Sequence, residues 1–320
     1  MIKGYGDMSK DKKALIFFYV ITFILSLVCD IFYIVTKIDV FLALLMWIPA
    51  VVGIICGKKF YGEERNLGLK RKIKPIFIIL GVLIPVMYLV PSYLIAWKIL
   101  GDPTIGLNTL AKTLSGADGI NGTAFAVIAF IPFVLVSALT AMGEELGWRG
   151  FAYPVLEREF GPVKAVLING ILWALWHFPL IIGGAYQSSV NLAYGLISFV
   201  ICIMAMTIIC CWTRSVSGSV IPAVLLHATH NAVDQIYLQA LSTNAKVPYY
   251  AGEQGFITIL LIAIVALIVV MAWKNIFQQV YGVPCETLSK NSMISPLISI
   301  SFAFLSGHEC RPSFINRSQT

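Results

Sequence analysis

Three short polar clusters interrupt a chain that is otherwise almost continuously apolar. The first contains Glu144, Glu145 and Arg149, the second His177, and the third His227, His230 and Asn231. Ionisable side chains at membrane depth are costly to bury, so they usually mark a functional site. Carboxylates, imidazoles and an amide are also the residue types with which a proteolytic centre activates water and stabilises an oxyanion.

The first cluster lies on a predicted helix, where adjacent side chains are separated by about 100° around the axis. Glu144 and Glu145 therefore face different surroundings. Arg149 stands at i+4 from Glu145 and can neutralise it, which leaves Glu144 without that partner and suited to act as a general base. Gly143 and Gly147 flank the pair and allow close backbone approach or a local break. Taken alone, the cluster is equally compatible with ordinary charges at the end of a membrane helix.

The second cluster extends along one helical face, because Asn169, Trp173 and His177 follow one another at intervals of four residues. Pro179 comes two residues after His177 and predicts that the helix bends or ends soon afterwards. An isolated histidine in an apolar helix is more often a packing residue than a catalyst. Here Trp173 shares the face of His177 and has a case for contact with substrate.

The third cluster also follows helical spacing. His227 and Asn231 stand at i and i+4, and Asp234 continues the same face at i+7. His230 and Asp234 are also four residues apart, so the spacing allows these two side chains to pair.

Together these groups fit hydrolysis of a peptide bond by an activated water. Glu144, helped by His177, would abstract a proton from water, and His227 with Asn231 would donate hydrogen bonds to the oxyanion. In a second interpretation Glu144, His177 and His227 bind a divalent metal such as zinc, with one position left for water. The first mechanism needs no cofactor, and the spacing of the residues does not choose between the two.

The composition identifies an integral membrane protein. Of the 320 residues 58% are hydrophobic and 12% charged, and the mean hydropathy is +0.85. The net charge of +7 comes mainly from short loops, which is typical of topology signals and not of a nucleic-acid surface. The seven cysteines form no CxxC pair, and neither an HExxH nor a GxSxG motif is present, so thiolate metal sites and the common serine and zinc hydrolase motifs are excluded.

Eight segments have about the length and apolarity of a membrane-spanning helix. They are 14–36, 39–56, 75–98, 124–146, 163–182, 191–212, 218–240 and 255–273. The predicted fold is an all-α polytopic bundle, with one transmembrane domain at 1–278 that contains a catalytic core at 124–240. The residues 279–320 are predicted to form a cytoplasmic tail.

The distribution of lysine and arginine predicts that both termini are cytoplasmic. With that orientation nineteen of these residues lie on the cytoplasmic side and four, Lys37, Lys98, Lys112 and Lys246, on the other. The loop from Gly101 to Thr123 is predicted to be an irregular external lid.

In order along successive helices, Glu144, Glu145 and Arg149 form an EExxxR motif, Trp173 and His177 an aromatic-xxx-His step, and His227 and Asn231 an HxxxN motif. This ordered set, over about residues 124 to 240, resembles the CAAX protease and bacteriocin-processing family, also called CPBP or Abi. The family contains the type II CAAX prenyl endopeptidases.

The resemblance implies a membrane-embedded chamber open to the cytoplasm. It implies that Glu144 and His177 activate water, that His227 and Asn231 form the oxyanion hole, and that Glu145 and Arg149 support them. Trp173 departs from the family pattern, which usually has Phe there, but it keeps an aromatic wall. The implied substrate is a prenylated protein or a leader-bearing peptide such as a bacteriocin precursor, and the short loops favour the cell membrane of a prokaryote.

Two other classes of function fit the same polar cavity. A proton-coupled transporter also places carboxylates and histidines inside a helical bundle, although it would favour inverted repeats that are not evident here. A non-catalytic immunity or peptide-binding protein would use the cavity without hydrolysis. All three classes predict membrane lipid as a partner, and the sequence does not predict the oligomeric state.

Overall fold

The computed structural model describes residues 8–62, 67–69 and 72–280, with the backbone alone for residues 274–280. Every regular element in these ranges is helical, which confirms the predicted all-α fold. The chain divides into two compact units, residues 1–270 and 271–320, and the first contains the three polar clusters. Residues 281–320 of the predicted tail lie outside the described residues, so the boundary at residue 278 stays a prediction.

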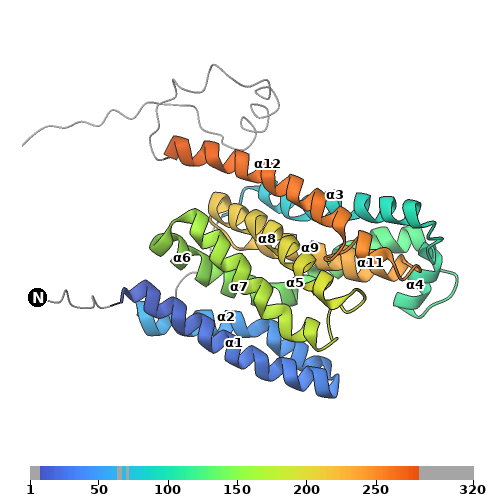
Figure 1. Cartoon of the computed structure of the whole chain (residues 1–320). Helices are drawn as coiled ribbons and strands as arrows, with labels where there is room; N and C mark the ends of the chain where they lie inside the picture. The colour runs from blue at the N-terminus through green and yellow to red at the C-terminus, as the bar shows by residue number, and fades with distance from the viewer. Residues whose placement is uncertain (1–7, 63–66, 70–71, 281–320) are drawn as a thin grey trace, which may run out of the picture. The chain divides into compact units, whose positions relative to one another are not determined.

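Figure 1 shows the helices in chain order. They are α1 (Lys10–Thr36), α2 (Asp39–Tyr61), α3 (Pro75–Leu100), α4 (Leu107–Ser115), α5 (Gly122–Glu145), the π-helix η1 (Leu146–Ala152), α6 (Tyr153–Phe160), α7 (Pro162–Ile182), α8 (Leu192–Ser217), α9 (Ile221–Asn231), the π-helix η2 (Ala232–Leu238), α10 (Gln239–Leu241), α11 (Val247–Tyr250) and α12 (Phe256–Val280).

Seven described segments are long and apolar enough to cross a membrane: α1, α2, α3, the continuous run Gly122–Phe160, α7, α8 and α12 as far as Trp273. The eighth predicted span, 218–240, is helical from Ile221 to Leu241 but is not among the seven, because its polar side chains lower its hydropathy. Large apolar side chains face outward on the spans, for example Val127 and Ile128 with 71% and 74% exposure. Such faces suit contact with lipid, so the fold is a polytopic membrane bundle.

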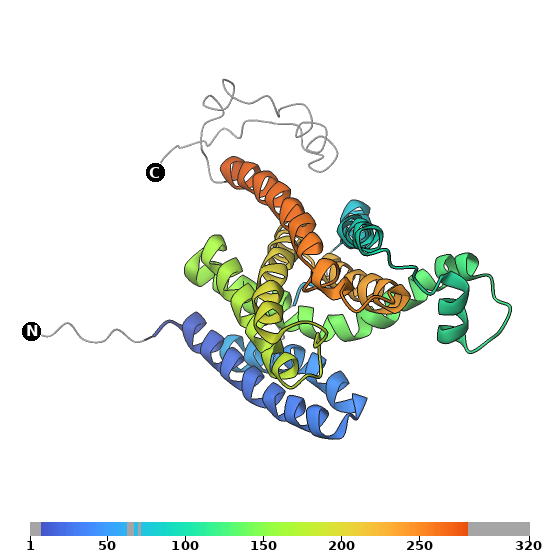
Figure 2. The same cartoon turned by 45° about the vertical axis from the view of Figure 1, so that its right-hand side comes forward.

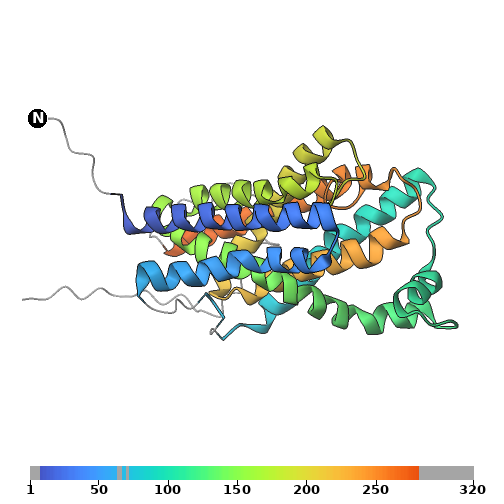
Figure 3. The same cartoon turned by 90° about the horizontal axis from the view of Figure 1, so that it is seen from below.

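One end of the bundle contains the short helix α6 and the other contains the short helix α4; these are the α6 end and the α4 end. Helices α1 and α2 lie side by side and antiparallel between these ends (Figures 1 and 3). The predicted external loop 101–123 is less irregular than expected, since it contains α4, which packs beside the first turns of α5 (Figure 2). Asn121 caps the start of α5 by accepting a hydrogen bond from the Ala124 amide at 2.9 Å.

Helix α9 lies at the centre of the packing. It contacts α3, α5 and α8, while α7 packs against α8 and α2 against both α5 and η1. The three polar clusters lie on α5 with η1, on α7 and on α9. These helices therefore contact one another directly or through α8. This arrangement brings residues far apart in the sequence to one buried region.

The two glycines that flank the carboxylates permit the close approach predicted for them. A Cβ atom on Gly143 would lie 2.5 Å from the Met46 carbonyl oxygen, and one on Gly147 would lie 2.3 Å from Pro49 Cβ, so α2 touches this backbone directly. The regular α-helix ends at Glu145, close to the predicted boundary of the fourth span at 146, and the chain continues through the π-turns of η1 into α6. A second π-helix, η2, follows Asn231 directly, and π-turns are frequent at functional sites.

Candidate active site

Glu145 links the first and third clusters. Its Oε1 accepts a hydrogen bond from Arg149 at 2.9 Å and lies 3.1 Å from Nδ1 of His227. Glu145 and Arg149 are fully buried, and His227 is 5% exposed. The predicted pair of Glu145 and Arg149 is therefore confirmed, and Glu145 also bonds a histidine that lies 82 residues away in the sequence.

Glu144 faces a different neighbour, as its helical position predicts. Its Oε2 accepts a hydrogen bond from the indole Nε1 of Trp173 at 2.8 Å, and its side chain is buried. The Arg149 guanidinium lies over the same indole ring, 3.9 Å from the ring centroid. Trp173 thus separates the Glu144 carboxylate from the guanidinium that neutralises Glu145, which keeps Glu144 free of a direct cationic partner among the described residues.

His177 lies one turn beyond Trp173. Its Nδ1 is 2.9 Å from the Trp173 carbonyl oxygen. A carbonyl only accepts hydrogen bonds, so Nδ1 carries the proton and the neutral ring presents a lone pair at Nε2. The ring packs among Trp176, Tyr186 and Phe199, with centroid distances of 4.8, 5.9 and 5.1 Å. This packing fixes the orientation of a side chain that can accept a proton.

His227 differs from His177 in the partner of its Nδ1, which is a carboxylate and not a backbone carbonyl. Its Nδ1 faces the Glu145 carboxylate, which accepts, so Nδ1 carries a proton here as well. Nε2 can then donate only when the ring is an imidazolium, a charge that the shared carboxylate of Glu145 can balance. The ring lies 5.4 Å from the Trp173 ring at 70°. One tryptophan therefore contacts Glu144, Arg149, His177 and His227.

Asn231 and Asn169 complete the predicted faces. Asn231 is the last residue of α9, one turn after His227, and is half-buried at the start of η2. Asn169 is buried and donates to the Trp148 carbonyl at 3.1 Å, so it ties α7 to η1 and not to the catalytic groups. The structure brings together six of the predicted site residues: Glu144, Glu145, Arg149, Trp173, His177 and His227. Asn231 follows His227 by one helical turn.

Several neighbours of the site were not predicted. Thr207 on α8 accepts a hydrogen bond from Arg149 at 3.1 Å. Tyr186, in the loop after α7, stacks on His177 and donates to Glu253 Oε2 at 2.5 Å. Burial raises the pKa of Tyr186, and the Glu253 carboxylate raises it further, so the phenol keeps its proton and donates. Both residues lie outside the helical patterns that identified the clusters. A single threonine or tyrosine does not by itself indicate a functional site in the sequence.

His230 does not form the simple pair with Asp234 that the spacing allows. Its Nε2 lies 3.2 Å from Glu253 Oε1 and its Nδ1 lies 2.5 Å from the Tyr88 hydroxyl, while Asp234 accepts from Tyr93 at 2.7 Å. Each carboxylate therefore has closer partners from other segments. The predicted zinc ligands Glu144, His177 and His227 stay a prediction. Among the described residues, the group whose ligand atoms all lie within 4.8 Å of one another is His230, Asp234 and Glu253.

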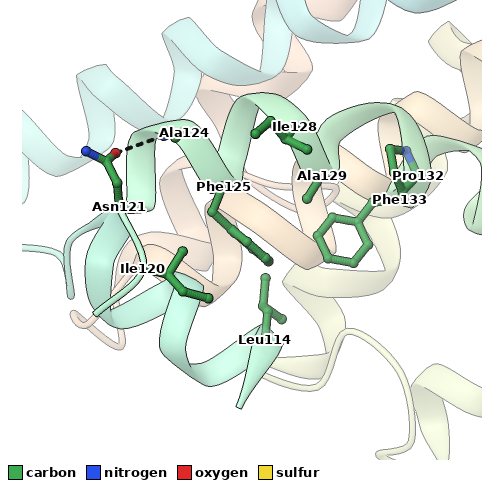
Figure 4. Close-up of a pocket in the computed structure, with 9 residues that line it drawn as sticks. All are labelled: Leu114, Ile120, Asn121, Ala124, Phe125, Ile128, Ala129, Pro132 and Phe133. Atoms are coloured by element: carbon green, nitrogen blue, oxygen red, sulfur yellow. Dashed lines mark hydrogen bonds between the residues drawn. The ribbon is translucent and has the colours of Figure 1, made fainter. Parts of the chain in front are cut away.

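An apolar pocket lies apart from these polar groups, between α4 and the first turns of α5 (Figure 4). Its volume is about 490 Å³, and its lining includes Leu114, Ile120, Phe125 and Phe133. None of the polar residues of the candidate site lines it. Its lining is apolar apart from Asn121.

Comparison with known proteins places the polar groups within a shared stretch of sequence. Residues 126–233 match the family described as type II CAAX prenyl endopeptidase Rce1-like. The chain is also similar to CAAX prenyl protease 2 of Methanococcus maripaludis, with 33% identity over 169 residues. That alignment covers 51% of this chain and 59% of the relative, so the chain matches a little over half of the relative's length. The stretch matched by the family includes every residue from Glu144 to Asn231.

Proposed function

We propose that the chain is an intramembrane endopeptidase, because residues 126–233 match the Rce1-like CAAX prenyl endopeptidase family. Its substrate would be a membrane-associated peptide or protein. The observation that carries this proposal is the arrangement of Glu144, His177 and His227 around the indole of Trp173. These three side chains come from three different helices and are all buried in the bundle.

In the proposed reaction Glu144 acts as the general base. One of its oxygens is held by Trp173, and the other is left to accept a hydrogen bond from water. His177 presents the lone pair of Nε2 toward the same reaction and accepts a second hydrogen bond from that water. Removal of a proton makes the water nucleophilic enough to attack a peptide carbonyl, and a general base of this kind contributes roughly 100- to 10,000-fold in rate.

His227 and Asn231 would stabilise the negative oxygen that forms after attack. The imidazolium of His227 would donate from Nε2, because Nδ1 already donates to Glu145. The Asn231 amide would supply the second donor from the next turn of the same helix. Arg149 shares the Glu145 carboxylate with His227 and holds it in position beside the imidazole. The proton taken up by Glu144 would pass to the leaving amine.

The proposed substrate class follows from the relative and from the surface of the bundle. The similar archaeal protein is named a CAAX prenyl protease, so a prenylated C-terminal segment is the first candidate. The exposed apolar faces of the spans would hold such a lipid chain in the membrane beside the site. A leader-bearing peptide such as a bacteriocin precursor is the second candidate. We further propose, from the lysine and arginine distribution, that both termini are cytoplasmic.

The test is cleavage of a synthetic peptide by the purified full-length chain in liposomes. One substrate carries a prenylated CAAX end, and a second has the same sequence without the prenyl group but with an apolar leader. Products are identified by mass spectrometry. Glu144→Gln is expected to lower kcat by roughly 100-fold or more. Glu159→Gln is the matched control, because Glu159 is a glutamate on α6 that bonds Ser9 at 2.7 Å, far from the site in the fold.

Full activity of Glu144→Gln would contradict the proposed base. Substrate uptake into the liposomes without cleavage would favour a transporter instead. Cleavage of the leader peptide alone would retain the endopeptidase and replace the prenylated substrate.

A further inference from the structure

A second group of buried ionisable side chains lies beyond the catalytic residues, toward the α4 end of the bundle. His230 at the end of α9, Asp234 in η2 and Glu253 before α12 each offer a ligand atom, and these atoms all lie within 4.8 Å of one another. Their exposed fractions are 1%, 0% and 3%. We infer that these three side chains bind a divalent transition-metal ion, with zinc as the ion that best fits the donors.

The charges of the group support a bound cation. Asp234 and Glu253 bring two carboxylates into a buried region, while His230 can bring at most one positive charge. No lysine or arginine among the described residues forms an ion pair with either carboxylate. A buried charge without a partner is strongly unfavourable. A divalent cation would balance both carboxylates and leave His230 neutral, which is the form in which imidazole binds metals.

The distance between the ligand atoms of His230 and Glu253 matches the spacing of ligands around a zinc ion. Tetrahedral zinc with bonds of about 2.0 to 2.1 Å to nitrogen and oxygen places its ligand atoms about 3.3 Å apart. His230 Nε2 and Glu253 Oε1 are separated by 3.2 Å. The hydroxyl of Tyr88 lies 2.5 Å from Nδ1 of the same ring and can accept its proton, which leaves the lone pair on Nε2 directed at the carboxylates. Water would complete the coordination.

The carboxylates also have the outer hydrogen bonds that orient metal ligands. Tyr93 donates to Asp234 Oδ1 at 2.7 Å, and Gln239 donates to Oδ2 at 3.2 Å. Gln187 donates to Glu253 Oε2 at 3.0 Å, beside the hydrogen bond from Tyr186. These two donors bind Oε2 of Glu253, so Oε1, which faces Nε2 of His230, is available to the metal. Such second-layer hydrogen bonds fix the direction of the ligand atoms.

The backbone around Glu253 is shaped to bring it over η2. Gly252 has a φ of +85°, which favours glycine, and a Cβ there would lie 3.4 Å from Asp234 Oδ1. A metal would therefore connect the loop before α12 to the end of α9. Because Tyr186 donates to Glu253 and stacks on His177, the metal would also stabilise the loop that carries Tyr186. Of the three ligands only His230 lies within residues 126–233, so the site goes beyond the stretch that matches the family.

The experiment uses full-length protein without a histidine tag, purified in detergent. The protein is stripped with a chelator, incubated with Zn²⁺, desalted and assayed for bound metal. The expected result is about one Zn²⁺ per chain with higher thermal stability than the stripped protein, since binding to the folded state alone stabilises it. X-ray absorption at the zinc edge should show imidazole and oxygen donors without sulfur. No retained Zn²⁺, or a sulfur-bound ion at one of the cysteines, would overturn the site.

Two histidine variants on the same helix locate the ion. His230→Asn should lose the bound Zn²⁺, whereas His227→Asn, three residues earlier, should keep it. The opposite result would overturn the inference and assign the metal to the catalytic histidines. If His230→Asn does not fold, Glu253→Gln serves instead, because a glutamine still accepts the hydrogen bonds of Tyr186 and Gln187 but binds zinc poorly. Unchanged Zn²⁺ content and stabilisation in that variant would also overturn the site.

Discussion

The indole Nε1 of Trp173 donates a hydrogen bond to Oε2 of Glu144 at 2.8 Å, and the guanidinium carbon of Arg149 lies 3.9 Å from the centroid of the same indole ring. The tryptophan thus orients the carboxylate and keeps the guanidinium from pairing with it. A phenylalanine at this position would keep an aromatic ring but could not donate a hydrogen bond. The hydrogen bond therefore depends on the indole N–H of Trp173.

Trp173→Phe should lower kcat by about tenfold and change KM little. The substitution removes one hydrogen bond to a charged group, which contributes about 1.5 to 3 kcal/mol, and the mobile carboxylate retains part of its function. The check is steady-state cleavage in liposomes. Trp148→Phe is the matched control, because the Trp148 Nε1 is buried without a hydrogen-bond partner among the described residues. Equal losses in the two variants would contradict the role of the Trp173 N–H.

Glu145→Gln should destabilise the protein and abolish activity. The change leaves Arg149 buried without its carboxylate, and breaking a buried ion pair by removing one partner costs about 3 to 5 kcal/mol. It also removes the charge that balances a His227 imidazolium. Thermal unfolding in detergent and peptide cleavage measure the two effects.

The double variant Glu145→Gln with Arg149→Met separates these effects. Replacing both members of a buried pair by uncharged side chains is often neutral for stability, so the double variant should regain much of the lost thermal stability. Its activity should stay low, because His227 still lacks an anionic partner. Recovery of activity together with stability would show that Glu145 acts through folding alone.

The sequence predicted the helices and the grouping of the polar clusters because both follow from helical periodicity and apolar length. Glu145 with Arg149 is a local i,i+4 pair, and its geometry needs no knowledge of the rest of the fold. The separation of Glu144 from Glu145 likewise follows from the angle between adjacent side chains. The contacts of Glu144 with Trp173 could not be predicted, since they depend on how α5 packs relative to α7.

The limits of the sequence prediction have the same physical origin. The helical spacing allows His230 to pair with Asp234, yet Glu253 from a distant loop lies within hydrogen-bond distance of His230 at 3.2 Å. The fourth span shows a milder limit, since the α-helix ends at Glu145 as the predicted boundary indicates, but the chain continues as the buried π-helix η1. The charge of Arg149 in η1 is neutralised by Glu145. Local patterns therefore fail where a partner arrives from another segment.

The loop at the α4 end should loosen at acidic pH through Asp102. Asp102 accepts hydrogen bonds from the amides of Thr104, Thr243 and Asn244 at 2.9 to 3.0 Å. Partial burial raises the pKa of Asp102, but these hydrogen bonds and that of the Thr243 hydroxyl lower it by more, so the pKa lies below its ordinary value. The carboxylate therefore stabilises the loop above its unfolded pKa of about 3.9 and loses this effect as the pH falls through the lower folded value.

Hydrogen exchange measures this effect when wild type and Asp102→Asn are compared at each pH. At neutral pH the Thr243 and Asn244 amides should exchange more slowly in the wild type than in the variant. The difference should vanish at a pH below the folded pKa of Asp102. Asp118→Asn is the control, because Asp118 forms an exposed ion pair with Lys112, and exposed pairs contribute little. A difference that persists unchanged in strong acid would contradict the assignment.

Gly147→Ala should lower stability and activity together. A Cβ at Gly147 would lie 2.3 Å from Pro49 Cβ and 2.5 Å from its carbonyl carbon, so α2 would have to move away from η1. Overpacking of this kind costs about 1 to 3 kcal/mol, and the displacement would reach Glu144 and Glu145 within one turn. Gly170→Ala is the matched control within α7: its nearest contact is the Met204 sulfur at 2.5 Å, part of a flexible side chain that can rotate away. Thermal unfolding and kcat of the two variants measure the difference, and equal behaviour would show that α2 yields to the added methyl group as readily as Met204 does.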